Sequence, residues 1–329
     1  MSGRFGKSGG RVSGALSRAP HVHHREHSSA HDDPSSSDLI TSKDNRWLKL
    51  FRAGLKGGGP AAGEAIAVEG PKLIEDAFRA GLRAEAVLVN ESSDMLLERV
   101  LVAARDTDDG ISQSRVLKAT DQLFAGAAGT ETPQGVAALF QQPNWHFDNV
   151  LGQRKHSASS PAASSALAVP VALVVVIVGV QDPGNVGTIL RSAEAFGATG
   201  VVAARGTADP WSPKAVRASA GSALRVPLLR GIAAASLLTQ LRAAGLKIVA
   251  TSSHAGAVED QKVDMTRPTA LFIGSEGAGL PDEIIQSADA TIAIPITAAV
   301  ESLNAGVAAS IVLYEAARQR ASSREASKL

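Results

Sequence analysis

The residues of this sequence that could do chemistry lie in three short segments, each rich in turn-forming residues. The first segment contains Pro183-Gly184, followed by Asn185 and then by Arg191. The Pro-Gly pair forces a turn, so Asn185 is expected where a helix starts. The two polar residues would be about 600° apart around an α-helix, so they could meet one ligand only if Asn185 lies in the loop. An arginine can hold a phosphate through two parallel hydrogen bonds. The alternative is a capping asparagine and a surface arginine.

The second and third segments also combine glycines or small residues with polar side chains. From Leu271 to Pro281, the pattern predicts a strand, a glycine-rich loop that holds Glu276, and a helix opened by the proline. Glycines let a backbone approach a ligand closely, although a plain strand-to-helix connection has the same pattern. In the third segment Ser302 precedes an apolar helix, where serine is a common N-cap and could be nothing more.

The elements that would position these segments lie in residues 169–320. Val171 to Val178 is a continuous valine-rich run, typical of a strand buried on both faces of a parallel sheet. All three segments follow predicted parallel strands, and ligands bind at the carboxyl ends of such strands in open α/β sheets. The alternation of elements predicts an α/β domain with a parallel sheet. Its further strands are expected at 200–203, 247–250, 271–273 and 291–294, and its helices at 186–196, 233–243 and 303–320.

A smaller α/β unit is predicted at residues 38–140. Strands are expected at 65–68, 86–89 and 135–140, with helices from Pro71 to about Ala80 and around 96–101. Around these two units we expect a disordered arm, a linker and a tail. The arm covers 1–37 and holds five of the eight histidines, the linker rich in Ser, Ala and Pro covers 141–168, and the flexible tail covers 321–329.

Composition and charge exclude several classes of protein. The absence of cysteine excludes disulfides, a thiol nucleophile, and cysteine-based zinc or redox sites. Residues 1–60 carry 10 Lys/Arg and 5 Asp/Glu, a basic stretch that could contact a polyanion or be a solvated tail. The longest uncharged apolar run, Ala166–Val180, is interrupted by Pro170 and falls short of the roughly 20 residues of a membrane helix. We expect a soluble, cytoplasmic protein with no membrane partner and no metal site.

Taken together, the three segments resemble the SpoU/TrmH family of RNA ribose 2′-O-methyltransferases, which have the SPOUT fold. The resemblance covers Val171 to Arg320. Asn185 and Arg191 match the first motif of the family, Gly274-Ser275-Glu276-Gly277 the second, and Ser302-Leu303-Asn304 the third. Two positions depart from the pattern, since Ala298 lies where glycine is frequent and Ala305 where valine is usual.

The first unit also looks like the substrate-binding domain of this family. Its recurring segments are matched by Val68-Glu69-Gly70 and by Thr132-Pro133-Gln134-Gly135-Val136, and its opening helix by Asn45 to Leu50. The fold class implied is therefore a SPOUT-type parallel α/β sheet with a C-terminal trefoil knot, preceded by a small α/β substrate-binding domain.

The resemblance further implies the cofactor, the partners and the site residues. The cofactor would be S-adenosyl-methionine, the substrate RNA, and the working form a homodimer with its active site at the subunit interface. Arg191 would hold an RNA phosphate beside the 2′-hydroxyl. Asn185, Glu276, Ser302 and Asn304 would orient the ribose, this arginine and the cofactor loops. Cofactor contacts are expected from Thr251, Gly274, Gly277, Ile294 and Leu303.

The RNA is expected to be 23S ribosomal RNA rather than transfer RNA, because the family's ribosomal enzymes commonly carry such a first domain. A transfer RNA methyltransferase of the same family is the nearest alternative. A non-catalytic RNA-binding protein on this fold would have lost Arg191 or Asn304, and both are present. A nucleotide-dependent oxidoreductase would need a glycine fingerprint after the first strand, which this sequence lacks.

Overall fold

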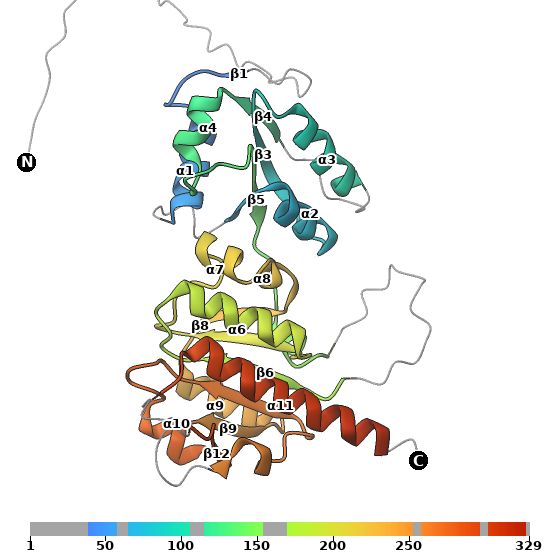
Figure 1. Ribbon diagram of the computed structural model, residues 1–329, viewed down its shortest axis with the longest axis vertical. Helices are drawn as coiled ribbons and strands as arrows, with labels where there is room; N and C mark the ends of the chain where they lie inside the picture. The colour runs from blue at the N-terminus through green and yellow to red at the C-terminus, as the bar shows by residue number, and fades with distance from the viewer. Residues whose placement is uncertain are drawn as a thin grey trace, which may run out of the picture. The chain divides into compact units, whose positions relative to one another are not determined.

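The computed structural model describes residues 39–57, 65–105, 115–153, 170–252, 258–296 and 302–326. These residues belong to one unit, Ser37–Leu329. Within them the strands form two separate sheets, each covered by helices (Figure 1). The arm at 1–37, most of the expected linker and Ala298 lie outside the described residues.

The first sheet has five strands in the order β1-β4-β3-β5-β2. The strands β1, β4 and β3 run parallel, whereas β5 is antiparallel to both of its neighbours. Helices α1 and α4 cover one face and α2 and α3 the other (Figure 1). Alternation along β3 explains this layering, because Leu88 packs with Phe51 of α1 while Val87 joins Phe78 of α2. The elements are β1 (Leu39–Ile40), α1 (Arg46–Lys56), β2 (Ala65–Glu69), α2 (Pro71–Arg79), β3 (Ala84–Asn90), α3 (Asp94–Arg105), β4 (Arg115–Ala119), α4 (Asp121–Ala127) and β5 (Val136–Gln141).

The strands and helices predicted for residues 38–140 are confirmed, with ends that differ by a few residues. Strand β4 and helix α4, which lie between α3 and β5, were not predicted because they have no obvious apolar pattern. In β4 only Ala119 is buried, so the strand carries no hydrophobic run. Helix α4 is only seven residues long, and its start is set by Thr120, whose hydroxyl accepts a hydrogen bond from the backbone N–H of Leu123 at 3.4 Å.

The second sheet has seven strands in the order β10-β12-β9-β11-β6-β7-β8, and every neighbouring pair is parallel. The predicted parallel α/β sheet is therefore confirmed. Every residue of β6 is buried, with Val175 packed in one core cluster together with α6 and α11, and Val174 in another together with α9. The elements are α5 (Phe147–Val150), β6 (Leu173–Ile177), α6 (Pro183–Ala195), β7 (Gly200–Ala204), α7 (Pro213–Ala218), α8 (Ser222–Arg225), β8 (Leu228–Ile232), α9 (Ala234–Ala243), β9 (Lys247–Thr251), β10 (Val258–Glu259), the 3₁₀ helix η2 (Asp260–Lys262), β11 (Thr269–Ile273), α10 (Asp282–Ser287), β12 (Ala290–Ala293) and α11 (Ala305–Ala326).

Two stretches expected to be irregular contain helix. Inside the expected linker, residues 147–150 form α5, and the carbonyl of Val150 accepts a hydrogen bond from the Thr199 hydroxyl at 2.7 Å. At the other end, α11 continues through the expected tail to Ala326. The sequence after Arg320 holds no glycine or proline to end the helix. No helix among the described residues is both long and apolar enough to cross a membrane.

One side chain of α11, Arg320, bonds to several backbone carbonyls beside the sheet. Its guanidinium donates hydrogen bonds to four backbone carbonyls, which belong to Val171 at 2.7 Å, Ala172 at 3.0 Å, Met265 at 2.8 Å and Arg267 at 2.9 Å. Burial lowers the pKa of Arg320 to about 10. The contacts join α11 to the chain entering β6 and β11, the two central strands.

Replacing Arg320 with methionine, which keeps much of the apolar stem, should destabilise the protein. The change leaves four carbonyls without this donor, and one unsatisfied buried polar group typically costs about 1–3 kcal/mol. We expect the free energy of unfolding to fall by about 3 kcal/mol in urea titrations. The neighbouring variant Arg324→Met, on the exposed last turn of α11, should unfold at the wild-type urea concentration. Equal stability of the two variants would contradict this structural role.

Candidate active site

The carboxyl ends of three adjacent strands, β12, β9 and β11, surround one cavity with a volume of about 440 Å³. Because the strands are parallel, the loops that follow them leave the sheet at the same edge. Ser302 and Leu303, just before α11, and Ala305, Ala308 and Val312 of α11 also line the cavity. All five residues predicted to contact a cofactor lie in its lining, namely Thr251, Gly274, Gly277, Ile294 and Leu303. Two of the predicted catalytic residues, Glu276 and Ser302, line it as well.

The glycine-rich loop after β11 turns back on itself and so forms one wall of the cavity. Ser275 and Gly279 exchange two backbone hydrogen bonds, at 3.2 and 3.0 Å. Gly279 has a φ of +66°, in the left-handed region that glycine adopts without strain. A Cβ on Gly274 would lie 2.4 Å from the carbonyl carbon of Gly279. The tight return of this loop therefore requires glycine at 274.

A hydrogen-bond network joins the three sequence segments beside the cavity. The amide of Asn185, in the first turn of α6, donates to the carboxylate of Glu276 in the loop after β11. Asn304, at the start of α11, donates through its own amide to the side-chain oxygen of Asn185 at 3.0 Å. The Glu276 carboxylate also accepts from the backbone N–H of Ala305 at 3.4 Å. Side chains 91 and 119 positions apart in the sequence thus meet, as the shared sheet edge predicted.

The N-cap of α11 is Asn304, and the expectation that Ser302 caps this helix is wrong. The Asn304 side-chain oxygen accepts from the backbone N–H groups of Gly306 at 3.0 Å and Val307 at 3.3 Å. Helix α11 begins at Ala305, two residues later than expected, so the capping position moves with it. Ser302 is left exposed at the rim of the cavity, where its hydroxyl is accessible to a ligand.

The start of α6 also differs from the expectation. The helix begins at Pro183, and its N-cap is Asp182, which accepts from the backbone N–H of Gly184 at 3.1 Å. The pKa of Asp182 is lowered, first by its hydrogen bond to Lys214 and then by that backbone N–H. Asn185 is therefore not a cap, and its amide is free to join the network described above.

Arg191 does not line the cavity of its own chain. It lies on α6 six residues after Asn185, about 9 Å along the helix axis and on a different face. Its side chain is exposed, and it makes no hydrogen bond or ion pair with any residue that the structure describes. The structure thus brings together four of the five predicted catalytic residues and leaves this guanidinium apart from them.

The apolar part of the cavity was not predicted from the sequence. Ile273, Ile292 and Val312 line it, and each is largely buried. In the sequence these residues are recognisable only as parts of predicted strands or of an apolar helix. That pattern does not distinguish a residue that lines a cavity from one in the hydrophobic core. Gly306 was also missed as a close-packing residue, since a Cβ there would lie 2.9 Å from the Thr188 methyl of α6. Close approach of α11 to α6 is what lets Asn304 reach Asn185.

We find no metal site in the described ranges, which contain no group of three or more His, Cys, Asp or Glu side chains placed to hold an ion. The histidine cluster of the arm lies outside those ranges.

Two protein-family models match parts of this chain. Residues 172–314 match the model of the SpoU rRNA Methylase family, and residues 62–138 match the model of the MRM3-like substrate binding domain. The first match contains Asn185, Arg191, Glu276, Ser302 and Asn304.

Similar proteins extend the match over most of the chain. The 23S rRNA (guanosine(2553)-2'-O)-methyltransferase RlmP of Bacillus subtilis (strain 168) is 31% identical over 247 residues, covering 75% of this chain and 86% of RlmP. An "Uncharacterized tRNA/rRNA methyltransferase" of Mycolicibacterium vanbaalenii is 34% identical over 78% of this chain and 77% of its own. The AdoMet-bound rRNA methyltransferase of Sinorhizobium meliloti superposes with a TM-score of 0.70 at 29% identity, over 85% of this chain and 97% of that one. The SpoU methyltransferase AviRb of Streptomyces viridochromogenes, in complex with AdoMet, gives a TM-score of 0.68 at 28% identity, over 84% of this chain and all of that one.

Proposed function

This chain belongs to the SpoU family of RNA methyltransferases, and from that premise we propose that it methylates the 2′-hydroxyl of a ribose in 23S ribosomal RNA. The observation that carries the proposal is the Asn185–Glu276–Asn304 network beside the cavity. A non-catalytic RNA-binding protein would have no need to keep three polar side chains from distant segments in one network. Similarity to RlmP, whose substrate is 23S rRNA, supports the choice of RNA.

Enzymes of this family use S-adenosyl-methionine, and the cavity fits that cofactor. Its volume of about 440 Å³ lies within the usual range of small-molecule sites. Apolar side chains such as Ile273 and Ile294 can cover a flat base, while the glycine-rich loop offers its backbone at close range. When bound, S-adenosyl-methionine supplies a methyl group on a positively charged sulfur. We assign its contacts to Thr251, Gly274, Gly277, Ile294 and Leu303.

Arg191 is the residue that we assign to the RNA beside the reacting hydroxyl. Its guanidinium can hold a phosphate through two hydrogen bonds and so place the adjacent 2′-hydroxyl for attack. An arginine guanidinium holds its proton strongly, so arginine is a poor general base. Its role is therefore positioning, together with electrostatic stabilisation of the negative charge that develops on the hydroxyl oxygen.

The hydrogen-bond network around Glu276 would hold two other polar side chains of the site in place, namely those of Asn185 and Asn304. Asn185 uses both ends of its amide within the network, which fixes its side chain between α6 and α11. The exposed hydroxyl of Ser302 can then contact the ribose at the rim. Asn304 couples the start of α11 to this arrangement through its capping bonds.

A homodimer would resolve the separation of Arg191 from its own cavity. In the proposed dimer, Arg191 of one subunit serves the cavity of the other. Helix α11 offers a surface for such pairing, since Val307 and Tyr314 are 46% and 58% exposed and lie on one side of the helix, seven residues apart. Arg191 lies on α6, which packs directly against α11 through Ser192 and Ser310.

The trefoil knot and the cytoplasmic location also belong to the proposal. Support for a knot comes from the path of the chain, because the segment after β12 lines the cavity beside the β11 loop before α11 packs on α6. The cytoplasmic location rests on the nature of the substrate, since ribosomal RNA is a cytoplasmic molecule in bacteria such as those that hold the relatives.

The substrate can be tested by mapping 2′-O-methyl groups in total RNA from cells with and without the gene. We expect one position in 23S rRNA to lose its methyl group and to regain it when the gene is restored. Restoration with an Arg191→Ala copy should fail, which ties the modification to this active site. Unchanged 23S rRNA together with one altered transfer RNA position would overturn the choice of substrate.

A further inference from the structure

Helix α1 carries a row of cations, here called the α1 stripe, made of Arg46, Lys49, Arg52 and Lys56. The helix buries Leu48, Phe51, Gly54 and Leu55 against the first sheet, and the stripe lies on the opposite side. Its eleven residues include four cations and no carboxylate. The cations are the only charged residues of this helix, so α1 presents only positive charge to solvent.

Two members of the stripe converge on a single backbone atom. Arg52 and Lys56 both donate to the carbonyl of Gly126, at 3.3 and 3.1 Å. That carbonyl belongs to the last turn of α4, where cations are favoured by the helix dipole. Their positive groups are thus held near each other by a neutral acceptor, which leaves both charges available to an anion.

The stripe is hardly neutralised by acidic neighbours. Within the parts of the chain that the structure describes, Asp44 is the one carboxylate that forms an ion pair with it, through Lys49 at 3.0 Å. Both side chains of that pair are more than half exposed, at 57% and 72%. An ion pair so open to water contributes little and is easily exchanged for another anion.

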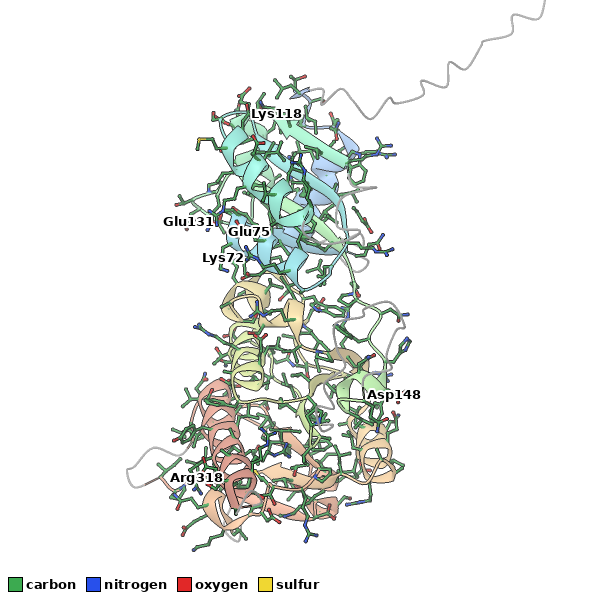
Figure 2. All side chains as sticks on the ribbon, turned by 90° about the vertical axis from the view of Figure 1, so that its right-hand side faces the viewer. Lys72, Glu75, Lys118, Glu131, Asp148 and Arg318 are labelled. Atoms are coloured by element: carbon green, nitrogen blue, oxygen red, sulfur yellow. The ribbon has the colours of Figure 1, made fainter. Side chains whose placement is uncertain are left out.

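Helix α2, which covers the other face of the same sheet, carries cations that are paired with carboxylates. Its Lys72 pairs with Asp76 at 2.8 Å, and its Arg79 pairs with Glu75 at 3.2 Å and with Asp76 at 3.1 Å. Figure 2 labels Lys72 and Glu75 on this helix. The charges of these cations and carboxylates offset each other. The two helices therefore differ in how many of their cations are paired with carboxylates, not in whether the cations are exposed.

An aromatic ring lies at the start of the stripe. The Arg46 guanidinium carbon is 5.2 Å from the ring centroid of Trp47, which is partly exposed. A cation at the first position of a helix is disfavoured by the helix dipole, so Arg46 gains nothing from its place in α1. An arginine over an aromatic ring is, however, a surface on which an unpaired base can stack.

We propose that α1 is an RNA-docking surface, on which the stripe contacts backbone phosphates and the Arg46–Trp47 pair receives an unpaired base. This inference rests on the proposed function and extends it to a helix that precedes the residues matched to a substrate-binding domain. Contacts from lysine and arginine to backbone phosphates position an RNA but do not distinguish its base sequence. The stripe therefore sets affinity for RNA and leaves the chemical step to the cavity.

The test compares two variants with the same loss of charge. In the stripe variant, Lys49, Arg52 and Lys56 are changed to glutamine. In the control variant, three exposed cations of the part of the chain that forms the second sheet are changed to glutamine, namely Lys262, Arg267 and Arg324. The probe is 23S rRNA transcribed in vitro, and binding is measured at several concentrations of KCl. Calorimetry with S-adenosyl-homocysteine and thermal melting show whether the cavity and the fold are intact in each variant.

We expect the Kd of the stripe variant for this RNA to rise about tenfold or more, and its salt dependence to become shallower by about two ions released. The control variant should bind within twofold of wild type. Arg46→Ala alone should weaken binding with a salt dependence shallower by at most one ion, because stacking is lost as well as a charge. A stripe variant that binds like wild type, or a control variant that weakens equally, would overturn the docking surface while leaving the proposed function intact. A wild-type protein that neither binds nor methylates the RNA would overturn both.

Discussion

Replacing Arg191 with alanine should lower the rate of methyl transfer to RNA by roughly 10³-fold. The expected loss corresponds to about 4 kcal/mol of transition-state stabilisation. Such a loss is typical when one charged donor is removed from a site where negative charge develops. Arg191 is exposed on α6 and absent from the cavity lining, so the affinity for S-adenosyl-homocysteine should stay within twofold of wild type. Single-turnover assays and calorimetry measure the two quantities separately.

Two further variants make this prediction sharper. Arg191→Lys keeps the charge but loses the planar pair of donors, so it should recover only part of the lost rate. If Arg191 serves the cavity of a partner subunit, an equal mixture of Arg191→Ala and Gly274→Ala subunits should regain about a quarter of the wild-type activity, since half of the dimers then hold one complete site. Near-normal turnover by Arg191→Ala would contradict the assignment, and a mixture no more active than its parts would contradict the dimer.

The convergence of the site could be predicted from the sequence because it follows from the geometry of a parallel sheet. The valine-rich run around Val175 predicts a strand buried on both faces, and β6 is such a strand. Polar residues that follow several parallel strands must then gather at one edge. Asn185 and Glu276, which are 91 positions apart, meet for that reason.

Other features depend on contacts that no local pattern contains. Ser302 and Asn304 are both good capping residues, and only the place where α11 meets α6 decides between them. Arg320 looks like any charge on a helix, yet it bonds to carbonyls more than a hundred positions earlier in the chain. Strand β4 was missed because its place in the sheet comes from pairing with β1 and β3 rather than from a hydrophobic run of its own.

Replacing Gly274 with alanine should weaken binding of S-adenosyl-homocysteine by roughly 10²-fold, as measured by calorimetry. The added methyl would lie 2.4 Å from the carbonyl carbon of Gly279 and 2.6 Å from the backbone nitrogen of Leu280. These are backbone atoms held by the paired turn of Ser275 and Gly279, so no side-chain rotation can relieve the overlap. The loop must open, and the cavity wall that it forms then moves away from the cofactor.

The matched control variant in this loop is Gly277→Ala. It also replaces a glycine with alanine, but it does not introduce an overlap with the backbone. A Cβ at Gly277 would meet no atom within 4 Å, so the protein without cofactor should melt at the wild-type temperature. Gly274→Ala should instead melt several degrees lower, because overpacking against backbone costs about 1–3 kcal/mol. If Gly274→Ala bound the cofactor analogue as tightly as wild type, the cavity beside the β11 loop would not be the methyl-donor site. We expect Gly274→Ala to bind the analogue more weakly and to melt at a lower temperature, while Gly277→Ala keeps the wild-type melting temperature. This result would show that cofactor affinity depends on the tight return of the loop.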